Sequence, residues 1–380
     1  MPIYLDNNAT TLPDPRVVEK MLPFLTTHYG NAASATHFYG WEARDAVEEA
    51  REKLAGLLNA DAKEMVFTSG ATESINLALK GVMEQFSGKG SHLVICSTEH
   101  KAVLDTAKHL ESSGKAVSIV PVNEQGIIDL VKLESAFRPD TVMAAVMLAN
   151  NETGVIHPVN EIANITRKHG ALFFCDATQA AGKIPIDVNI LGIDLLACSA
   201  HKMYGPKGIG ALYINKKSAA SKLIAQMDGG GHERGFRSGT LNVPAIAAFG
   251  EAAEISRKEM DVDRQRISQL RDALEQKLTG SGNAYINGHP KIRMYNVTNI
   301  SFPGLEPQRF MMALSKHIAV SSGSACTSVV QEPSYVLKAM GLNDERARNA
   351  FRFSLGRFTT EEEVYTAGDV VLQTLSRFRS

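Results

Sequence analysis

The sequence carries almost no net charge, with 40 lysines and arginines against 41 aspartates and glutamates. A protein without an excess of positive charge lacks the electrostatic attraction that binds nucleic acid or an anionic membrane surface. No apolar run comes near the roughly 18 residues of a membrane span, and the first residues lack the basic start and apolar core of a signal peptide. We therefore expect a cytoplasmic protein that binds neither nucleic acid nor membrane.

Cysteine is also scarce. The chain has four cysteines, none of them in a CxxC or Cys/His spacing: Cys96, Cys175, Cys198 and Cys326. This spread argues against a zinc site and against a disulfide framework, so no metal site is expected. Cys96, Cys175 and Cys198 lie in apolar runs and are expected to be small core residues. Cys326 differs, because it lies among serine, glycine and alanine, where a thiol gains little from packing.

What is present is an ordinary globular composition of 380 residues, 44% hydrophobic and 21% charged, which is long enough for about two domains. From about residue 40 to 215, helical patterns alternate with short β-branched apolar runs. This alternation predicts an α/β fold with a mainly parallel, buried sheet. The runs expected to form its strands are Glu64–Thr68, His92–Ser97, Ala116–Val120, Thr141–Leu148, Ala171–Asp176, Asp194–Ser199 and Ala211–Ile214.

The last third of the chain has a different pattern. Residues Val243–Leu278 indicate one or two long charged helices, and short strand-like pieces, a Gly/Ser-rich loop and a closing helix follow Asn283. We expect a larger domain at residues 15–260 and a smaller α+β domain made of residues 1–14 and 261–380. Since no low-complexity linker separates the two, they are expected to pack closely.

Ligands of parallel sheets collect beyond the carboxyl ends of the strands, so the polar residues after each run are candidates for a binding site. The run Glu64–Thr68 leads into Ser69–Ser74 and a helical stretch. Such a junction can hold a phosphate on the amides of a helix N-terminus. The same residues equally suit a helix-capping arrangement, so the motif alone leaves both interpretations open.

Two further strand ends carry groups that could do chemistry. Asp176 ends an apolar run, which is a costly place for a carboxylate without a cationic or hydrogen-bonding partner. The next run ends at Ser199 and continues into Ala200, His201 and Lys202. A lysine there could form a Schiff base, with Ser199 and His201 beside it for a phosphate. Considered alone, an aspartate at the end of a strand more often caps a helix or forms an ion pair, and an isolated lysine is usually exposed to solvent.

Taken together and in this order, the motifs resemble the NifS/IscS-type cysteine desulfurases, which are class V aminotransferase-like enzymes of fold type I that use pyridoxal 5'-phosphate (PLP). The resemblance runs over nearly the whole chain. It implies a large domain with a mainly parallel seven-stranded sheet and a smaller α+β domain that carries the catalytic cysteine loop. The segments that carry it are Asp6–Thr11, Thr68–Ser74, Thr98–His100, Asn150–Glu152, Asp176–Gln179, His201–Gly208, Gly229–Thr240, Ser321–Ser328 and Arg352–Arg357.

The resemblance implies that Lys202 holds PLP as a Schiff base, while Asp176 pairs with the pyridine nitrogen and keeps it protonated, so that the ring can accept electrons. His100 matches the residue stacked on the ring, and Gln179 matches the one near its phenolic oxygen. Thr240 matches a residue that reaches the phosphate from the neighbouring subunit, which implies a homodimer. The other positions implied to contact the cofactor are Ala71, Thr72, Asn151, Ser199 and His201.

The same resemblance implies the reaction. Asn151 and Arg352 match the positions that bind the substrate carboxylate. The planar guanidinium of Arg352 suits this role because it can donate two parallel hydrogen bonds to a carboxylate. L-cysteine would be converted to L-alanine, and its sulfur would pass to Cys326 as a persulfide. Because a thiol with an ordinary pKa of about 8.5 is mostly protonated at neutral pH, some group must assist Cys326, and His100 is the candidate.

The persulfide would then pass to an acceptor protein such as an iron–sulfur scaffold, and Cys326 could ligate a cluster during that transfer. Two alternatives remain. Another PLP reaction on the same fold, such as that of a selenocysteine lyase or an aminotransferase, would be distinguished by its product. A catalytically silent sulfur-relay partner would need neither Lys202 nor Cys326, so the presence of both disfavours it.

Overall fold

The computed structural model describes residues 2–280, 282–322 and 332–378. Its centre is a seven-stranded sheet in the order β2-β8-β7-β6-β5-β3-β4. Strand β8 is antiparallel to its neighbours β7 and β2, and every other pair is parallel. The expected fold class is confirmed, and each predicted run forms one strand: β2 (Met65–Thr68), β3 (His92–Cys96), β4 (Ala116–Val120), β5 (Thr141–Ala145), β6 (Leu172–Asp176), β7 (Leu195–Ser199) and β8 (Gly210–Ile214).

The sheet is buried on both faces, which explains the near-continuous apolar runs. Successive side chains of a strand point to opposite faces. In β6, Phe173 and Cys175 pack into one apolar cluster, while Phe174 packs into the cluster on the other side. As expected, Cys96, Cys175 and Cys198 are buried core residues. Burial raises the pKa of each of these thiols, which keeps them protonated.

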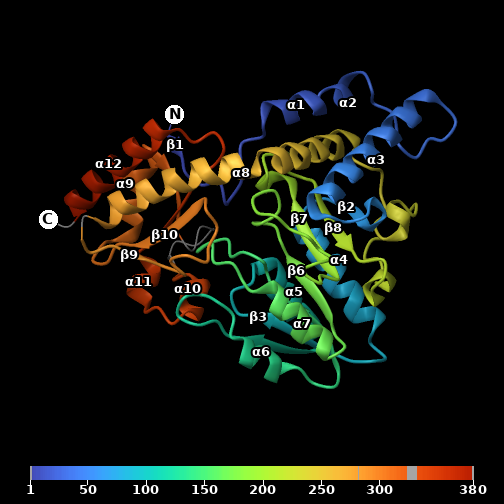
Figure 1. Cartoon of the computed structure of the whole chain (residues 1–380), viewed down its shortest axis with the longest axis horizontal. Coiled ribbons are helices and arrows are strands. Elements are labelled where there is room, and N and C mark those ends of the chain that lie inside the picture. Colours follow the sequence, from blue (N-terminus) through green and yellow to red (C-terminus); the bar gives the residue numbers. More distant parts are fainter. Residues whose placement is uncertain (1, 281, 323–331, 379–380) are drawn as a thin grey trace.

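Helices cover the two faces of the large sheet, as Figure 1 shows. Helix α3 packs with the first half of α8 in one apolar cluster, and α4 and α5 contribute to the other. The α-helices are α1 (Pro15–Met21), α2 (Pro23–Thr26), α3 (Phe38–Leu58), α4 (Ala71–Gln85), α5 (Lys101–Ser112), α6 (Leu130–Ala136), α7 (Val159–Lys168), α8 (Val243–Thr279), α9 (Pro307–Ser315), α10 (Tyr335–Ala339), α11 (Asp344–Arg348) and α12 (Glu361–Phe378). Short 3-10 helices are η1 (Ala62–Glu64), η2 (Ala200–Lys202), η3 (Ala219–Lys222) and η4 (Glu233–Gly235).

A second, smaller body contains both ends of the chain (Figure 1). Its main sheet has the order β12-β13-β10-β9 and is antiparallel, while β1 and β11 form a separate parallel pair. The first residues therefore lie beside a strand more than 300 positions later, since Ile3 pairs with Ile318. The strands are β1 (Ile3–Tyr4), β9 (Tyr285–Ile286), β10 (Val297–Ser301), β11 (Ile318–Ala319), β12 (Ser321–Ser322) and β13 (Ala350–Ser354).

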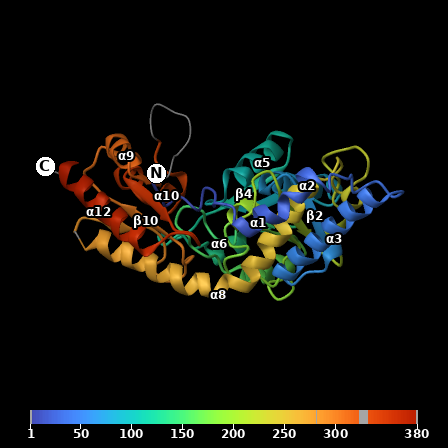
Figure 2. The ribbon, with the colours of Figure 1, turned by 90° about the horizontal axis from the view of Figure 1, so that it is seen from above.

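Residues Val243–Thr279 form one helix of 37 residues rather than two. Figure 2 shows this helix, α8, passing along both bodies. Its first half, including Phe249, packs into the core of the large sheet, and Ile267 and Leu274 pack into the core of the smaller body. We propose the boundary near residue 260 for this reason, with residues 1–14 assigned to the smaller domain because β1 pairs there.

Across the described residues, none of the helices combines the length and the apolar character that a membrane span requires. Nor do the histidines, cysteines and acidic residues in that part of the chain form a group of three or more that could hold a metal ion.

The buried thiols give a first test of the packing. Replacing Cys175 with serine should lower the free energy of unfolding by roughly 1–3 kcal/mol, because a hydroxyl enters an apolar strand environment without a partner. Urea unfolding followed by circular dichroism measures this loss. Cys175→Ala serves as the control, since it removes the sulfur without adding a polar group. Equal stability of the serine variant and the wild type would contradict the burial described here.

Candidate active site

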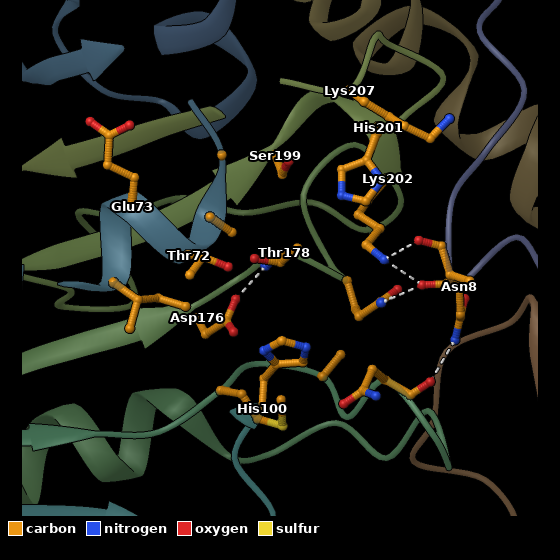
Figure 3. A pocket seen from close by; sticks show the side chains of 18 of the residues that line it. Asn8, Thr72, Glu73, His100, Asp176, Thr178, Ser199, His201, Lys202 and Lys207 are labelled. Atoms are coloured by element: carbon orange, nitrogen blue, oxygen red, sulfur yellow. Dashed lines mark hydrogen bonds between the residues drawn. The ribbon is translucent and has the colours of Figure 1, made fainter. Parts of the chain in front are cut away.

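A pocket of about 540 Å³ lies at the carboxyl edge of the large sheet, within the size range of small-molecule sites. Asp176 ends β6 and Ser199 ends β7, and His100 follows β3 after a short turn. Figure 3 shows the side chains of Asp176, His100 and Lys202 facing a common space. The lining residues are Asn8, Ala9, Ser69, Gly70, Ala71, Thr72, Glu73, Ile75, His100, Met147, Ala149, Asn151, Asp176, Thr178, Gln179, Ser199, His201, Lys202, Lys207, Gly208 and Arg352.

Most of the residues singled out in the sequence meet in this pocket. Those that line it are Ala71, Thr72, His100, Asn151, Asp176, Gln179, Ser199, His201, Lys202 and Arg352. Thr240 does not line it, and its side chain is exposed on the surface of this chain. Cys326 lies in the segment 323–331, outside the described residues.

Lys202 ends the 3-10 helix η2, directly after β7. Its Nζ donates to the backbone carbonyls of Asn8 at 2.6 Å and of Ala9 at 2.5 Å, as the dashed lines in Figure 3 show. No carboxylate within 4 Å pairs with this amine among the described residues. Desolvation by burial, followed by the positive charge of Arg352, lowers its pKa from 10.5 to about 8. Lys202 is therefore an amine that loses its proton close to neutral pH.

Asp176 is a buried carboxylate at the opposite side of the pocket from Lys202 (Figure 3). Its Oδ1 accepts the backbone N–H of Thr178 at 2.9 Å. A second oxygen remains for a ligand, and a buried carboxylate gains most from a protonated nitrogen. The position can thus hold the cationic end of a flat heterocycle.

The N-terminus of helix α4 supplies the anion-binding end of the pocket. Gly70 caps this helix without a side-chain hydrogen bond, so its first amides are free to face a ligand. The start of α4 packs closely against strand β8 of the sheet. The space is so small that a Cβ atom added to Gly210 would lie 2.6 Å from the Cα of Gly70. Ser199 and His201 line the same pocket. This arrangement suits a phosphate group.

His100 is the N-cap of α5, and its Nδ1 accepts the backbone N–H of Ala102 at 3.1 Å. Partial desolvation in the cleft lowers the pKa of the imidazole below 6.5, an effect that nearby Asp176 partly offsets. The ring is therefore mostly neutral at neutral pH. Because Nδ1 is an acceptor, the single proton of the neutral ring lies on Nε2. His100 accordingly presents an N–H group at Nε2.

Arg352 reaches the pocket from β13, in the smaller body. One guanidinium nitrogen, Nη2, pairs with Asp6 at 2.7 Å and donates to Ser321 at 3.0 Å, while Nη1 donates to the carbonyl of Asn151 at 3.0 Å. The Nε of Arg352 and the Oδ1 of Asn151 are buried and have no partner among the described residues. The protein alone thus leaves both side chains incompletely satisfied, as in a site that binds a polar ligand.

The sequence analysis overlooked several residues of the pocket. Asn8 and Ala9 act through backbone carbonyls, which leave no residue-specific signal, although both lie in the quoted motif Asp6–Thr11. Glu73 also lines the pocket and pairs with Arg237 at 2.8 Å. The sequence leaves open whether the stretch around Glu73 caps a helix or holds a phosphate, and it gives no sign of the ion pair with Arg237.

Comparison with known proteins identifies the family of this chain. Residues 3–366 match the family described as aminotransferase class-V. A protein named cysteine desulfurase IscS from Anaeromyxobacter dehalogenans (strain 2CP-C) is 54% identical over 365 residues, which cover 96% of this chain and 90% of that protein.

Solved structures agree with the sequence match. A structure described as a NifS-like protein superimposes with a TM-score of 0.93 at 39% identity, with all of both chains covered. A structure titled SspA in complex with cysteine has a TM-score of 0.83 at 34% identity and covers 94% of this chain and 100% of that one. Enzymes of this family depend on PLP. With this sheet, this pocket and near full-length matches of high identity, the chain belongs to the cysteine desulfurases of the class-V aminotransferase family.

Proposed function

We propose that this chain converts L-cysteine to L-alanine with PLP bound at Lys202 and transfers the sulfur to Cys326 as a persulfide. The observation that carries the proposal is the placement of an amine with a lowered pKa, Lys202, across one pocket from the buried carboxylate of Asp176. The relatives named cysteine desulfurase, and a related structure titled as a complex with cysteine, support the choice of substrate.

The residues present fit the cofactor. Lys202 would join its aldehyde, and Asp176 would hold a proton on the ring nitrogen. The amides at the start of α4, with Thr72, Ser199 and His201, would hold the phosphate. When bound, PLP supplies an electron sink that makes the α-proton of an attached amino acid acidic.

Lys202 is the base that would remove that proton. With a pKa of about 8, a useful fraction of the amine is neutral at neutral pH, whereas an ordinary lysine is almost entirely protonated. While Nζ is free of the cofactor, the carbonyls of Asn8 and Ala9 hold it at a defined position.

Arg352 and Asn151 would bind the substrate carboxylate at the other end of the pocket. Asp6 and Ser321 already hold the guanidinium, so its direction is set before the substrate arrives. His100 would donate a hydrogen bond to the substrate through Nε2. As long as Nδ1 caps α5, the neutral ring has no free nitrogen to accept a proton, so it can act as a base only when that capping bond breaks.

Cys326 would take the sulfur. Its thiolate attacks the sulfur of the bound cysteine, an S–S bond forms and the C–S bond breaks, with the electron pair left on carbon. This β-carbon takes up a proton, the proton that Lys202 removed returns to the α-carbon, and the products are alanine and a persulfide on Cys326. The persulfide sulfur would pass to an acceptor protein such as an iron–sulfur scaffold.

We place this chemistry in the cytoplasm, where thiols such as those of Cys96, Cys175 and Cys198 stay reduced.

The proposal includes a homodimer. Large apolar side chains are exposed together in residues 12–41, around α1, α2 and the start of α3, a segment that projects from the large body in Figure 1. Exposed apolar surface of this extent is typical of a protein interface. Thr240 is likewise exposed and lies outside the pocket of its own chain, so it is available to the pocket of a second copy. The exposed apolar residues are Leu12, Val18, Leu22, Leu25, Tyr29, Phe38, Tyr39 and Trp41.

Replacing Cys326 with serine tests the sulfur transfer. The variant should still bind PLP and cysteine, yet form roughly a hundredfold less alanine or lower, because a hydroxyl does not accept the sulfur. Alanine is measured by chromatography, and the wild type is analysed by mass spectrometry after brief exposure to cysteine. One added sulfur is expected on the peptide that contains Cys326. Cys198→Ser is the control and should retain the persulfide, whereas a persulfide mainly on another cysteine would overturn the mechanism.

The acidity of Lys202 can be measured in the cofactor-free protein. The rate at which an amine reagent labels Lys202 should rise with pH around a midpoint near 8. Arg352→Gln should move that midpoint upward, because it removes a positive charge that lowers the pKa of Lys202. Asp6→Asn should move it downward, since the charge of Asp6 raises that pKa. Peptide mass spectrometry follows the labelling, and shifts of the same sign in both variants would refute this account of the pocket.

Mixed dimers test the shared site. One subunit carries Lys202→Ala and the other carries Thr240→Ala, so that under the proposal one pocket collects both defects and the other has none. The mixture should then form alanine faster than the mean of the two parent homodimers. If each defect stays with the chain that carries it, mixing brings no gain and Thr240 does not serve the second subunit.

A further inference from the structure

Lys183 is a buried lysine that no step of the proposed reaction uses. Only 2% of its surface is exposed, and it does not line the pocket. It lies in a series of tight turns after β6, in which the N–H of Lys183 donates to the carbonyl of Ala180. Gln179 precedes it by four positions, a spacing that brings two side chains together on one side of a helical turn.

The surroundings of this amine are unfavourable for a cation. Desolvation by burial, followed by the positive charges of Lys202 and Arg352, lowers the pKa of Lys183 from 10.5 to about 7. No carboxylate forms an ion pair with it among the residues that the structure describes. A methionine of similar length would fill the same space without this penalty. Core packing by itself therefore gives no reason for a lysine at this position.

The hydrogen bonds of Lys183 lead directly to the pocket. Its Nζ donates to Oε1 of Gln179 at 3.3 Å, and Nε2 of Gln179 donates to the carbonyl of Asn8 at 2.9 Å. The same carbonyl accepts Nζ of Lys202 at 2.6 Å. A continuous chain of three hydrogen bonds thus joins the buried amine to the amine of the proposed active site (Figure 3 shows the last two).

In its charged form the amine of Lys183 donates hydrogen bonds and cannot accept them. Lys183 on one side and the carbonyl of Asn8 on the other therefore set the orientation of the side-chain amide of Gln179. The oxygen is held toward Lys183, and the NH₂ group toward Asn8 and the pocket. Without Lys183, only the Asn8 carbonyl opposes an amide that has turned over and presents its oxygen to the pocket.

We propose that Lys183 is a positioning residue, which holds the amide of Gln179 in the orientation that offers N–H groups to the pocket and so to the phenolic oxygen of bound PLP. This proposal rests on the proposed function, because it takes PLP as the ligand. An N–H facing an anionic oxygen stabilises it, whereas an amide oxygen in the same place would repel it.

The test is Lys183→Met in the PLP-bound protein, followed by the pH at which the visible absorption of the cofactor changes. Loss of the donor makes the phenolic oxygen more basic, so the transition should move upward by roughly half a pH unit or more. Removal of the positive charge of Lys183 acts in the same direction. The comparison is therefore repeated in a Gln179→Ala background, where an effect carried by Gln179 disappears and a direct charge effect persists.

Ser256→Ala provides a matched control. Ser256 is fully buried next to the same turn, as its side chain would lie 3.2 Å from a Cβ on Gly182. This variant should leave the absorption transition unchanged. An unchanged transition in Lys183→Met, or a shift that is equally large with Gln179→Ala, would overturn the proposal.

A second measurement needs no cofactor. In the cofactor-free protein, the nitrogen-15 NMR signals of the Gln179 side-chain amide, identified by their loss in Gln179→Ala, should shift as Lys183 titrates near pH 7. The charged groups that act on this titration are Lys202 and Arg352. In Lys183→Met the part of the shift centred near pH 7 should vanish, leaving only a change that follows Lys202 near pH 8. A shift that stays centred near pH 7 would contradict the contact.

The two measurements separate this inference from the proposed function. If the NMR coupling is found but the protein binds no PLP and forms no alanine, the proposed function fails while the contact stands. If alanine is formed normally and the absorption transition is the same with and without Lys183, the inference fails. A merely structural lysine would change only the unfolding curve. At Lys183 the unfolded state binds more protons than the folded state between about pH 7 and 10.5, so this lysine makes the stability of the wild type rise with pH over that window. Lys183→Met lacks this contribution.

Discussion

The contact of the segment Asp6–Thr11 with both bodies of the molecule is the constraint on which the pocket depends. The backbone carbonyls of Asn8 and Ala9 hold the amine of Lys202. The backbone N–H of Asn8 donates to Oγ of Ser354, on a strand of the smaller body. A loop that crosses between two bodies exposes many backbone groups, and the carbonyls of Asn8 and Ala9 are satisfied here by side chains that also form the site. A shift of this segment would therefore move the two halves of the pocket relative to each other.

A second consequence is electrostatic. The segment brings Asp6 to Arg352 in an ion pair, and it lies beside Lys202, whose amine has no carboxylate partner among the described residues. Lys202, Lys183 and Arg352 thus share one partly desolvated region, and each positive charge there makes the next one less favourable. The two lysines respond by titrating near neutral pH, which is the property that a proton-transferring amine requires.

The large sheet could be predicted closely because its strands are buried on both faces. Every position of β6 and β7 before the last is therefore apolar, and the runs stand out against their polar flanks. Helix α8 was harder to predict, and the sequence left open whether it is one helix or two, since its two halves pack into different cores. The pairing of β1 with β11 joins residues from the two ends of the chain, and local patterns carry no information about such a contact.

By itself, the sequence determined the order of strands and helices and the residue types that gather where strands end, among them Asp176, Ser199 and Lys202. These features follow from local periodicity and from the rule that parallel strands point their carboxyl ends to one edge. Only the tertiary structure decided which groups in the pocket are joined by hydrogen bonds, because backbone carbonyls such as that of Asn8 have no side-chain signature in the sequence. It also decided that Lys183 is buried behind Gln179, since the exposure of a lysine depends on what packs over it and not on its neighbours in the chain.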